Sequence, residues 1–392
     1  MTTIKNNEHK KLNFSSEREQ SQVCLNSAEH EKNQGRKVLN VPNLRFPEFQ
    51  GEWEYFLIND VCSEFKSGKN IKADSVFECG EYPVYGGNGL RGYTSSYNHE
   101  GSYVLIGRQG ALCGNVRSVY GKTYITEHAI AVAGNEKSNT NFLHYLFLKM
   151  NLGQYSDQSA QPGLAVNKLL KLKVALPIIS EQTKIAKLLS LLDERIATQN
   201  KIIDKLQSLI KGISNRIFAS IQGIEYRMGD IVTIINGNSN VQDAVTQSKD
   251  GLYPFFDRSE DIKYLPTFLF DKEAIIYPGE GTEFMPRYFK GKFALHQRCY
   301  AIFDFNEIIN ARFLYFYLKT RNSYFVKNAV GSTVPSLRLD TFQKLKVIIP
   351  PKKIQHSVSL CLSSMEQKCN VEKKILHKLL KQKQYLLRQM FI

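Results

Sequence analysis

Two clusters of basic and aromatic residues are the part of this sequence best suited to bind a charged, aromatic ligand. In the first half they are Arg91, Tyr93, Tyr97, Arg108, Gln109, Arg117, Lys122 and Tyr124, and in the second half Arg258, Lys263, Tyr264, Arg287, Tyr288, Lys290, Lys292 and Arg298. Arg and Gln side chains can make paired hydrogen bonds to base edges, while Lys and Tyr can hold phosphates. For any single residue the alternative is an ordinary solvated surface residue. We expect these residues to lie in loops. Taken together, the two clusters predict a nucleic-acid-binding surface in each half of the chain.

Three further motifs resemble catalytic or cofactor sites, but their surroundings do not support them. Gly87-Asn88-Gly89-Leu90-Arg91-Gly92 has the glycine spacing of dinucleotide sites, yet no helical period follows that could present a helix N-terminus to a phosphate. Glu64-Phe65-Lys66 resembles the end of a nuclease carboxylate-lysine element without a convincing partner aspartate before it. His128 is a candidate base, although a hydrogen-bonded histidine at a strand start is the more common case. No complete catalytic set emerges.

The composition narrows the class of partner. The chain has 392 residues and a formal net charge of +15, which favours an acidic polymer, with nucleic acid ahead of an anionic membrane. No apolar run approaches the roughly 20 residues that a membrane-spanning helix needs. The seven cysteines form no Cys-x-x-Cys pair. We therefore expect a cytoplasmic protein with reduced thiols, no metal site and no membrane partner.

The two halves of the sequence are versions of each other. Lys171-Leu172-Lys173-Val174-Ala175-Leu176-Pro177 recurs 173 residues later as Lys344-Leu345-Lys346-Val347-Ile348-Ile349-Pro350, with five of seven positions identical. At the same offset Gln182 matches Gln355 and Phe218 matches Phe391, and upstream the offset changes by only two or three residues. Repeat periods of solenoid proteins are roughly 20 to 50 residues, so this longer period predicts two duplicated domains.

Each repeat is predicted to be α+β. Between residues 41 and 177, short runs rich in Tyr, Val and Ile alternate with clusters of Gly, Asn and Ser, which is typical of strands and turns. A helix is expected at residues 141–150, with its counterpart at 311–320. Residues 1–40 are polar and without period, so we expect a disordered leader, although an upstream start codon explains them equally well.

A long helix with a heptad pattern follows each repeat, and Ser180 is the expected N-cap of the first. Five heptads favour a coiled-coil seam, while a core helix of a larger bundle stays an alternative. The predicted seam residues are Ile185, Leu189, Leu192, Ile196, Gln199, Ile203, Leu206 and Ile210 in the first helix and Val358, Leu362, Met365, Cys369, Glu372, Leu376 and Leu379 in the second.

The chain connectivity predicts how these helices pair. The second repeat begins directly after the first helix, and Pro350-Pro351 starts the second helix at that same end. Helices that pair within the chain must therefore be antiparallel, with the repeats separated along a rod of about 40 residues, roughly 60 Å. Gln199 and Glu372, at equivalent seam positions near the midpoint, are predicted to meet in a polar layer that selects the register. Pairing between two chains stays an alternative.

The sequence from residue 41 to 392 resembles the specificity subunits of type I restriction-modification systems. The segments that carry the resemblance are Val41-Pro42-Asn43-Leu44-Arg45-Phe46-Pro47 with Trp53, Tyr82-Pro83-Val84-Tyr85-Gly86-Gly87, Ile106-Gly107-Arg108-Gln109-Gly110, Thr126-Glu127-His128-Ala129-Ile130, and both Lys-Leu-Lys-Val exits into the long helices. The second repeat departs from them with Phe256-Asp257-Arg258-Ser259 and Pro278-Gly279-Glu280-Gly281. Base-reading residues are therefore not transferred from the family.

The resemblance implies a domain division and a set of partners. Residues 41–179 and 223–351 would be target-recognition domains, and residues 180–222 and 352–392 spacer helices that form an antiparallel coiled coil with pseudo-twofold symmetry. Each domain would read half of an interrupted double-stranded DNA target. Two methyltransferase subunits and the restriction and translocase subunits would carry the catalysis, with S-adenosylmethionine, ATP and magnesium bound by them and no cofactor in this chain. The alternatives are a self-contained DNA methyltransferase or nuclease, and a coiled-coil scaffold.

Overall fold

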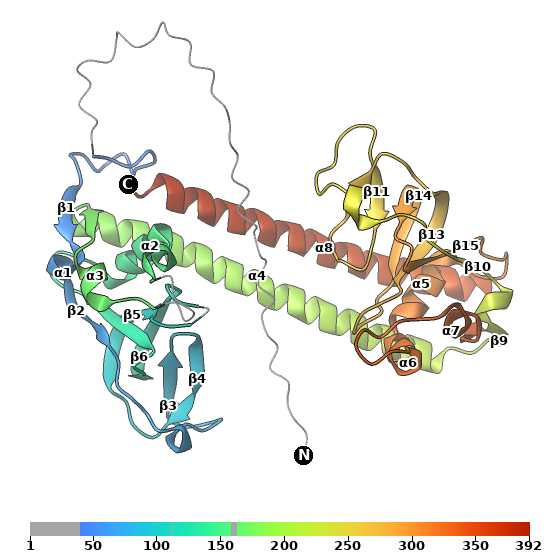
Figure 1. The fold of residues 1–392 in the computed structure, drawn as a ribbon, viewed down its shortest axis with the longest axis horizontal. Helices are drawn as coiled ribbons and strands as arrows, with labels where there is room; N and C mark the ends of the chain where they lie inside the picture. Colours follow the sequence, from blue (N-terminus) through green and yellow to red (C-terminus); the bar gives the residue numbers. More distant parts are fainter. Residues whose placement is uncertain (1–39, 111, 158–162) are drawn as a thin grey trace, which may run out of the picture.

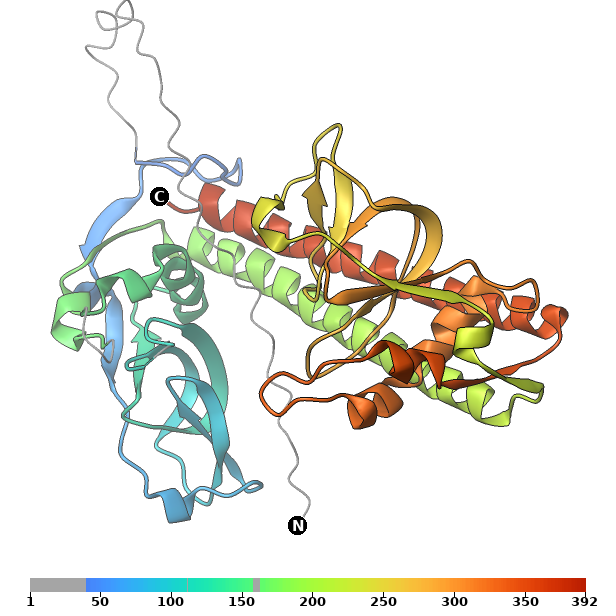
Figure 2. The same cartoon turned by 45° about the vertical axis from the view of Figure 1, so that its right-hand side comes forward.

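The structure, a computed structural model, describes residues 40–110, 112–157 and 163–392 (Figure 1). Two α+β domains lie at opposite ends of a pair of long helices, which run side by side in both views (Figures 1 and 2). The leader expected at residues 1–40 lies outside the described residues except for Asn40. Within the part of the chain that is described, no helix is both long enough and apolar enough to cross a membrane.

Domain 1 (Glu54–Leu176) is a curved six-stranded sheet with a helix on one face. Its elements are β1 (Glu54–Leu57), α1 (Ile58–Val61), β2 (Cys62–Ser67), η1 (Ala73–Ser75), β3 (Tyr82–Gly86), β4 (Gly89–Thr94), β5 (His99–Gly107), β6 (Val116–Ile125), β7 (Ala129–Gly134), α2 (Thr140–Met150), η2 (Leu152–Tyr155), α3 (Val166–Leu170) and β8 (Lys173–Leu176). The sheet order is β2-β7-β5-β6-β3-β4, and β1 pairs separately with β8.

Domain 2 (Ile224–Ile349) repeats this plan. Its elements are β9 (Ile224–Arg227), η3 (Met228–Asp230), β10 (Thr233–Asn236), η4 (Val241–Asp243), β11 (Tyr253–Phe256), β12 (Lys263–Leu265), β13 (Phe270–Pro278), β14 (Arg287–Leu295), β15 (Cys299–Phe303), α5 (Ala311–Lys319), α6 (Asn322–Asn328), α7 (Leu339–Gln343) and β16 (Lys346–Ile349). The order β10-β15-β13-β14-β11-β12, with β9 paired to β16, matches domain 1 strand for strand. The predicted duplication is confirmed.

The expected short helices, α2 and α5, are present and cover equivalent faces of their sheets. Asn139 caps α2 by accepting from the backbone N–H groups of Asn141 and Phe142, and Asn310 caps α5 by accepting from that of Phe313. Along β5, Val104 and Ile106 point into the core that contains α2, whereas Leu105 belongs to the core on the other face. This alternation is the period of two expected of a strand buried on both faces.

The two long helices, α4 (Ile179–Ser220) and α8 (Lys352–Gln389), run antiparallel (Figure 1). All fifteen predicted seam side chains are buried or half-buried.

The predicted N-cap of α4 at Ser180 is wrong. Ile178 is the residue at the N-cap position, and no side chain makes a capping hydrogen bond there. Gln182 holds the helix start instead. Its Nε2 donates to the oxygens of Pro177 and Lys137 at 2.8 and 2.9 Å, and its Oε1 accepts from Asn139 N.

Gln355 makes the same set of bonds at the start of α8. Its Nε2 donates to the oxygens of Pro350 and Ile308, both at 2.8 Å, and its Oε1 accepts from Asn310 N at 2.7 Å. The match between Gln182 and Gln355 in the sequence therefore has a structural cause. Each glutamine ties the start of a long helix to the loop before the short helix of the domain it leaves.

The far end of each long helix enters the core of the other domain. Phe218, near the end of α4, packs against Phe313 of domain 2 with ring centroids 5.5 Å apart. Phe391, just after α8, packs against Phe142 of domain 1 at 5.1 Å and against Trp53 at 6.4 Å. Each domain thus holds the start of one long helix and the end of the other, an arrangement that requires the helices to be antiparallel within one chain.

Candidate nucleic-acid interface

Most of the sixteen candidate DNA-binding residues lie on strands, so the expectation that they lie in loops is wrong for eleven of them. Arg91 and Tyr93 are on β4, Arg117, Lys122 and Tyr124 on β6, Lys263 and Tyr264 on β12, and Arg287, Tyr288, Lys290 and Lys292 on β14. The five candidates outside strands are Tyr97, Arg108, Gln109, Arg258 and Arg298.

In domain 1, three turns meet at one end of the sheet: residues 86–88, 107–110 and 126–128. The backbone there is packed so closely that a Cβ on Gly87 would lie 2.6 Å from the oxygen of His128 and 3.4 Å from the Cα of Gly107. Arg108 N donates to His128 O at 2.9 Å, and Thr126 N donates to Tyr85 O at 2.9 Å. Glycine is therefore required at this junction, which we call the reading end of domain 1.

Polar side chains surround the reading end of domain 1. Arg91, Gln109 and Arg117 are exposed, and the Arg117 guanidinium would lie 3.2 Å from a Cβ placed on Gly89. Gln109 Oε1 lies 3.3 Å from Nδ1 of His128, whose Nε2 lies 3.1 Å from Glu127 Oε1. His128 thus has hydrogen-bond partners at the start of β7. Guanidinium, amide and imidazole groups are the donors and acceptors that suit base edges and phosphates.

Domain 2 forms its reading end at the same place in the fold, from residues 257–259, 279–281 and 296–298. His296 N donates to Phe256 O at 2.9 Å, as Thr126 N does to Tyr85 O. Pairing of Ala129 with Gly107 and of Cys299 with Pro278 makes Arg298 the counterpart of His128, and His296 lies two residues before it. The two reading ends therefore share a backbone frame and differ in side chains.

Asp257 fastens the turn that carries Arg258. Its Oδ2 lies 2.7 Å from Lys263 Nζ, and its Oδ1 accepts from Ser259 N at 2.8 Å and from Ser259 Oγ at 2.5 Å. Burial acts to raise the pKa of Asp257, but the hydrogen bonds from Lys263 and Ser259 outweigh it and hold that pKa below its usual value. Arg287 donates to Ser259 O, and Arg258 itself is exposed.

Arg117 and Arg287 are equivalent residues of the two domains. Arg117 pairs with Leu105 on β5 and Arg287 with Ile276 on β13, at the same distance from the ends of those strands. Each lies beside the turn that follows β3 or β11. Sequence reasoning selected both arginines from charge alone, but it missed Asp257 and Ser259, whose contribution depends on contacts across the turn.

The remaining candidates are not brought to the reading ends. Lys122 lies farther along β6, and Lys290 and Lys292 farther along β14. Tyr124 donates from its hydroxyl to Asn70 O at 2.9 Å, and Tyr93 exchanges backbone hydrogen bonds with Phe77. The candidates that lie around the reading ends are therefore Arg91, Arg108, Gln109, Arg117, Arg258, Lys263, Arg287 and Arg298.

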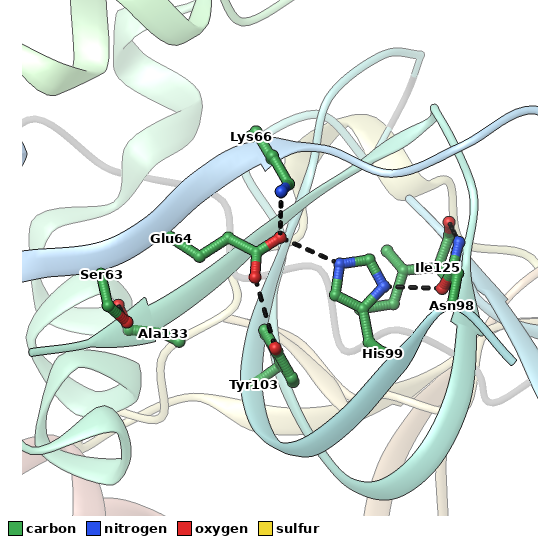
Figure 3. A network of polar contacts seen from close by, with 8 residues as sticks. All are labelled: Ser63, Glu64, Lys66, Asn98, His99, Tyr103, Ile125 and Ala133. Atoms are coloured by element: carbon green, nitrogen blue, oxygen red, sulfur yellow. Dashed lines mark hydrogen bonds and ion pairs between the residues drawn. The ribbon is translucent and has the colours of Figure 1, made fainter.

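The carboxylate of Glu64 is engaged in a network inside domain 1 (Figure 3). Its oxygens lie 3.2 Å from Lys66 Nζ, 3.1 Å from His99 Nε2 and 3.3 Å from the Tyr103 hydroxyl. Asn98, whose Oδ1 accepts from Ile125 N, holds the other ring nitrogen of His99. In residues 40–110, 112–157 and 163–392, no group of three or more His, Cys, Asp or Glu side chains could hold a metal. The resemblance of Glu64-Phe65-Lys66 to a nuclease element has no structural support.

One side of the helix pair exposes apolar side chains. Leu191, Ile202 and Leu209 of α4 and Val371 and Ile375 of α8 are between 39% and 52% exposed, and each precedes a seam residue by one position. We call these five residues the apolar coil face. Leu191 and Ile375 line the same groove on it, and Ile202 and Ile375 are matched by the 173-residue offset.

The domains pack along the other side of the helix pair. Asp193 and Glu366, which each follow a seam residue by one position, accept hydrogen bonds from the hydroxyls of Tyr145 and Tyr315 at 3.0 and 2.8 Å. The apolar coil face is therefore not the surface on which the chain's own domains rest.

The sequence pattern of the type I restriction modification DNA specificity domain matches residues 50–208 and 224–381. A 154-residue segment is 42% identical to the specificity subunit of the type I restriction enzyme EcoprrI of Escherichia coli, covering 38% of each chain. A putative type I restriction enzyme specificity subunit of Haemophilus influenzae, S.HindORF215P, is 24% identical over 356 residues, which is 81% of this chain and 89% of that relative.

Solved structures show the same fold. The S subunit of a type I restriction-modification system from M. genitalium is 18% identical, with a TM-score of 0.70 over 90% of this chain and 99% of that one. A chain from a study of type I R-M complex assembly and conformational transition is 14% identical, with a TM-score of 0.50 over 86% and 97%. Because the specificity-domain pattern covers both repeats and more than half of the sequence, the chain belongs to the family of type I restriction-modification specificity subunits.

Proposed function

We propose that this specificity subunit reads an interrupted, asymmetric double-stranded DNA target, with one half-site bound by each domain. The observation that carries the proposal is the pair of reading ends. They share one backbone frame and equivalent arginines, Arg117 and Arg287, but differ at Gly86-Gly87-Asn88 and Asp257-Arg258-Ser259. Equal frames with different side chains are what two different half-sites require, since base contacts specify while phosphate contacts position.

The helix pair is proposed to set the gap between the half-sites. The units are residues 41–179 and 223–351 as reading domains and residues 180–222 and 352–392 as spacer helices. A helix with the 42 residues of α4 is about 63 Å long at 1.5 Å per residue, and both of its ends are embedded in domain cores. A strut anchored in this way keeps the domains at a fixed distance.

The apolar coil face is proposed to bind two methyltransferase subunits. Two copies of one partner need two similar surfaces, and the equivalent positions of Ile202 and Ile375 in the two repeats supply them.

As the specificity subunit, this chain is the non-catalytic component. S-adenosylmethionine, ATP and magnesium are proposed to bind to the methyltransferase and restriction/translocase subunits, which act with this chain on DNA in the cytoplasm.

The proposal is tested by expressing the chain with its methyltransferase subunits and mapping methylated bases across the host genome. One bipartite sequence with a fixed gap is expected, and methylation scattered without such a sequence would contradict the proposal.

Two alternative functions predict different experimental results. Turnover by the purified chain alone, given DNA, methyl donor and magnesium, would favour a self-contained enzyme. An assembled complex without sequence-dependent DNA affinity would favour a scaffold.

A further inference from the structure

A second feature recurs in both domains, away from the reading ends. In domain 1 the rings of Tyr82 and Tyr97 lie 5.0 Å apart, and Lys122 Nζ lies 4.8 Å from the centroid of Tyr97. In domain 2 the rings of Tyr253 and Phe268 lie 4.8 Å apart, and Lys292 Nζ lies 4.9 Å from the centroid of Phe268. We call each set of three residues an aromatic-lysine stack.

The two stacks occupy equivalent places in the fold. Tyr82 and Tyr253 are the first residues of β3 and β11. Tyr97 and Phe268 each lie two residues before β5 or β13. Lys122 and Lys292 each directly precede the residue that pairs with the first residue of that strand, Thr123 with His99 and Phe293 with Phe270. The stacks are therefore features of the shared fold and not of one domain.

The stacks have been kept while the reading ends have diverged. Gly86-Gly87-Asn88 has become Asp257-Arg258-Ser259 in the other domain, yet the ring-ring-ammonium geometry agrees to within 0.2 Å in each of its two distances. A feature that both domains keep irrespective of their half-site serves something common to both half-sites. On duplex DNA the common element is the phosphate backbone.

Exposure and chemistry fit this assignment. Tyr97 and Phe268 are each 41% exposed, and both lysines are exposed, so the stacks are on the surface of their domains. The ring beneath each lysine attracts the ammonium and limits where the long side chain can place it. The ammonium carries only N–H donors, which suit phosphate oxygens but cannot accept a bond from a base edge.

We propose that the aromatic-lysine stacks are phosphate anchors, which hold the backbone of duplex DNA without regard to its sequence. The inference rests on the proposed function, because it requires the domains to bind DNA. It adds a division of labour between the reading ends, which distinguish bases, and the stacks, which contribute affinity that depends on salt.

The test compares Lys122→Ala, Lys292→Ala and the double variant in the complex with the methyltransferase subunits. Affinity for a duplex without the target is measured between 50 and 200 mM salt, and the methylated sequence is mapped separately. Each substitution is expected to reduce the slope of log affinity against log salt by about 0.9, and the double variant by about twice that. The methylated sequence stays unchanged. Lys171→Ala and Lys327→Ala, which remove exposed lysines elsewhere on the two domains, keep the wild-type slope.

Further variants separate anchoring from packing. Tyr97→Leu and Phe268→Leu keep apolar bulk but remove the ring, and they are expected to weaken affinity less than loss of the lysine. Lys122→Arg, which keeps both charge and ring contact, restores the slope. An unchanged slope in the double alanine variant, with or without a lower melting temperature, overturns the proposal, as does a changed base preference at either half-site. A wild-type complex without a bipartite methylated sequence would instead contradict the proposed function, since the slope is measured on non-target DNA.

Discussion

Gln199 of α4 donates from Nε2 to the Oε2 of Glu372 on α8 at 2.6 Å and to its backbone oxygen at 3.1 Å. The two residues are 173 positions apart, which is the offset of the duplication, so equivalent residues of the two repeats meet near the middle of the helix pair. Lys368 completes the layer with an ion pair to the other Glu372 oxygen at 2.6 Å. A polar layer in an apolar seam aligns the helices at a cost in stability.

Replacing both members of this layer is expected to stabilise the fold. Gln199→Leu combined with Glu372→Leu extends the apolar seam through its midpoint and removes the need to bury polar groups. The melting temperature of the double variant should exceed that of the wild type by calorimetry. Gln199→Leu alone serves as the control, because it leaves the Glu372 carboxylate without its Gln199 donor and should lower the melting temperature. A double variant that melts below the wild type would contradict this account.

The same layer predicts how stability responds to acid. Hydrogen bonds from Lys368 and Gln199 outweigh burial and lower the pKa of Glu372 in the folded chain. A carboxyl with a lower pKa when folded stabilises the fold above its unfolded pKa of roughly 4.3, and this contribution is lost as pH falls through the folded pKa. In urea unfolding between pH 7 and 3, the double leucine variant should therefore lose less stability than the wild type. Equal or greater loss would exclude this role for Glu372.

Asp257 is expected to affect only the half-site bound by domain 2. Asp257→Ala removes the acceptor of Lys263 and Ser259, and lost buried hydrogen bonds cost roughly 1–3 kcal/mol each. Methylation kinetics on substrates altered in one half-site should show roughly tenfold weaker discrimination at that half-site and no change at the other. Asp304→Asn, which changes an exposed, ion-paired carboxylate of the same domain, is the matched control. Equal losses at both half-sites would mean that the substitution acts on folding.

Charge on the apolar coil face is expected to prevent assembly. Ile202→Glu and Ile375→Glu place carboxylates at exposed, equivalent positions, so folding should be little affected while an apolar contact with a partner becomes unfavourable. Sizing chromatography with the methyltransferase subunit should show loss of one bound copy for each single variant and of both for the double. Lys201→Glu is the control for charge alone, because Lys201 is exposed on the same helix but lies two positions from the seam residues on either side and is not part of the apolar coil face. Retention of both copies by the double variant would place the docking surface elsewhere.

The architecture was predictable from the sequence to the extent that it repeats. The Lys-Leu-Lys-Val exits, the Gln182–Gln355 match and the heptads together predicted two domains and antiparallel helices, because periodicity and connectivity leave few other arrangements. The start of α4 was not predicted correctly, since Gln182 holds it through contacts with residues more than 40 positions away. The placement of the arginines was also not predicted, because it depends on contacts between turns that are far apart in the sequence, such as those of Arg108 with His128 and of Thr126 with Tyr85.

The central claim is that the helix pair is a ruler between two readers. It is tested most directly by inserting one heptad into each long helix beside the Gln199–Glu372 layer, which keeps the seam and lengthens the strut by about 10.5 Å. Mapping of methylated sites should then show both half-sites unchanged and the gap between them longer by about three base pairs, at 3.4 Å per base pair. Half-sites recovered with the original gap would contradict the account.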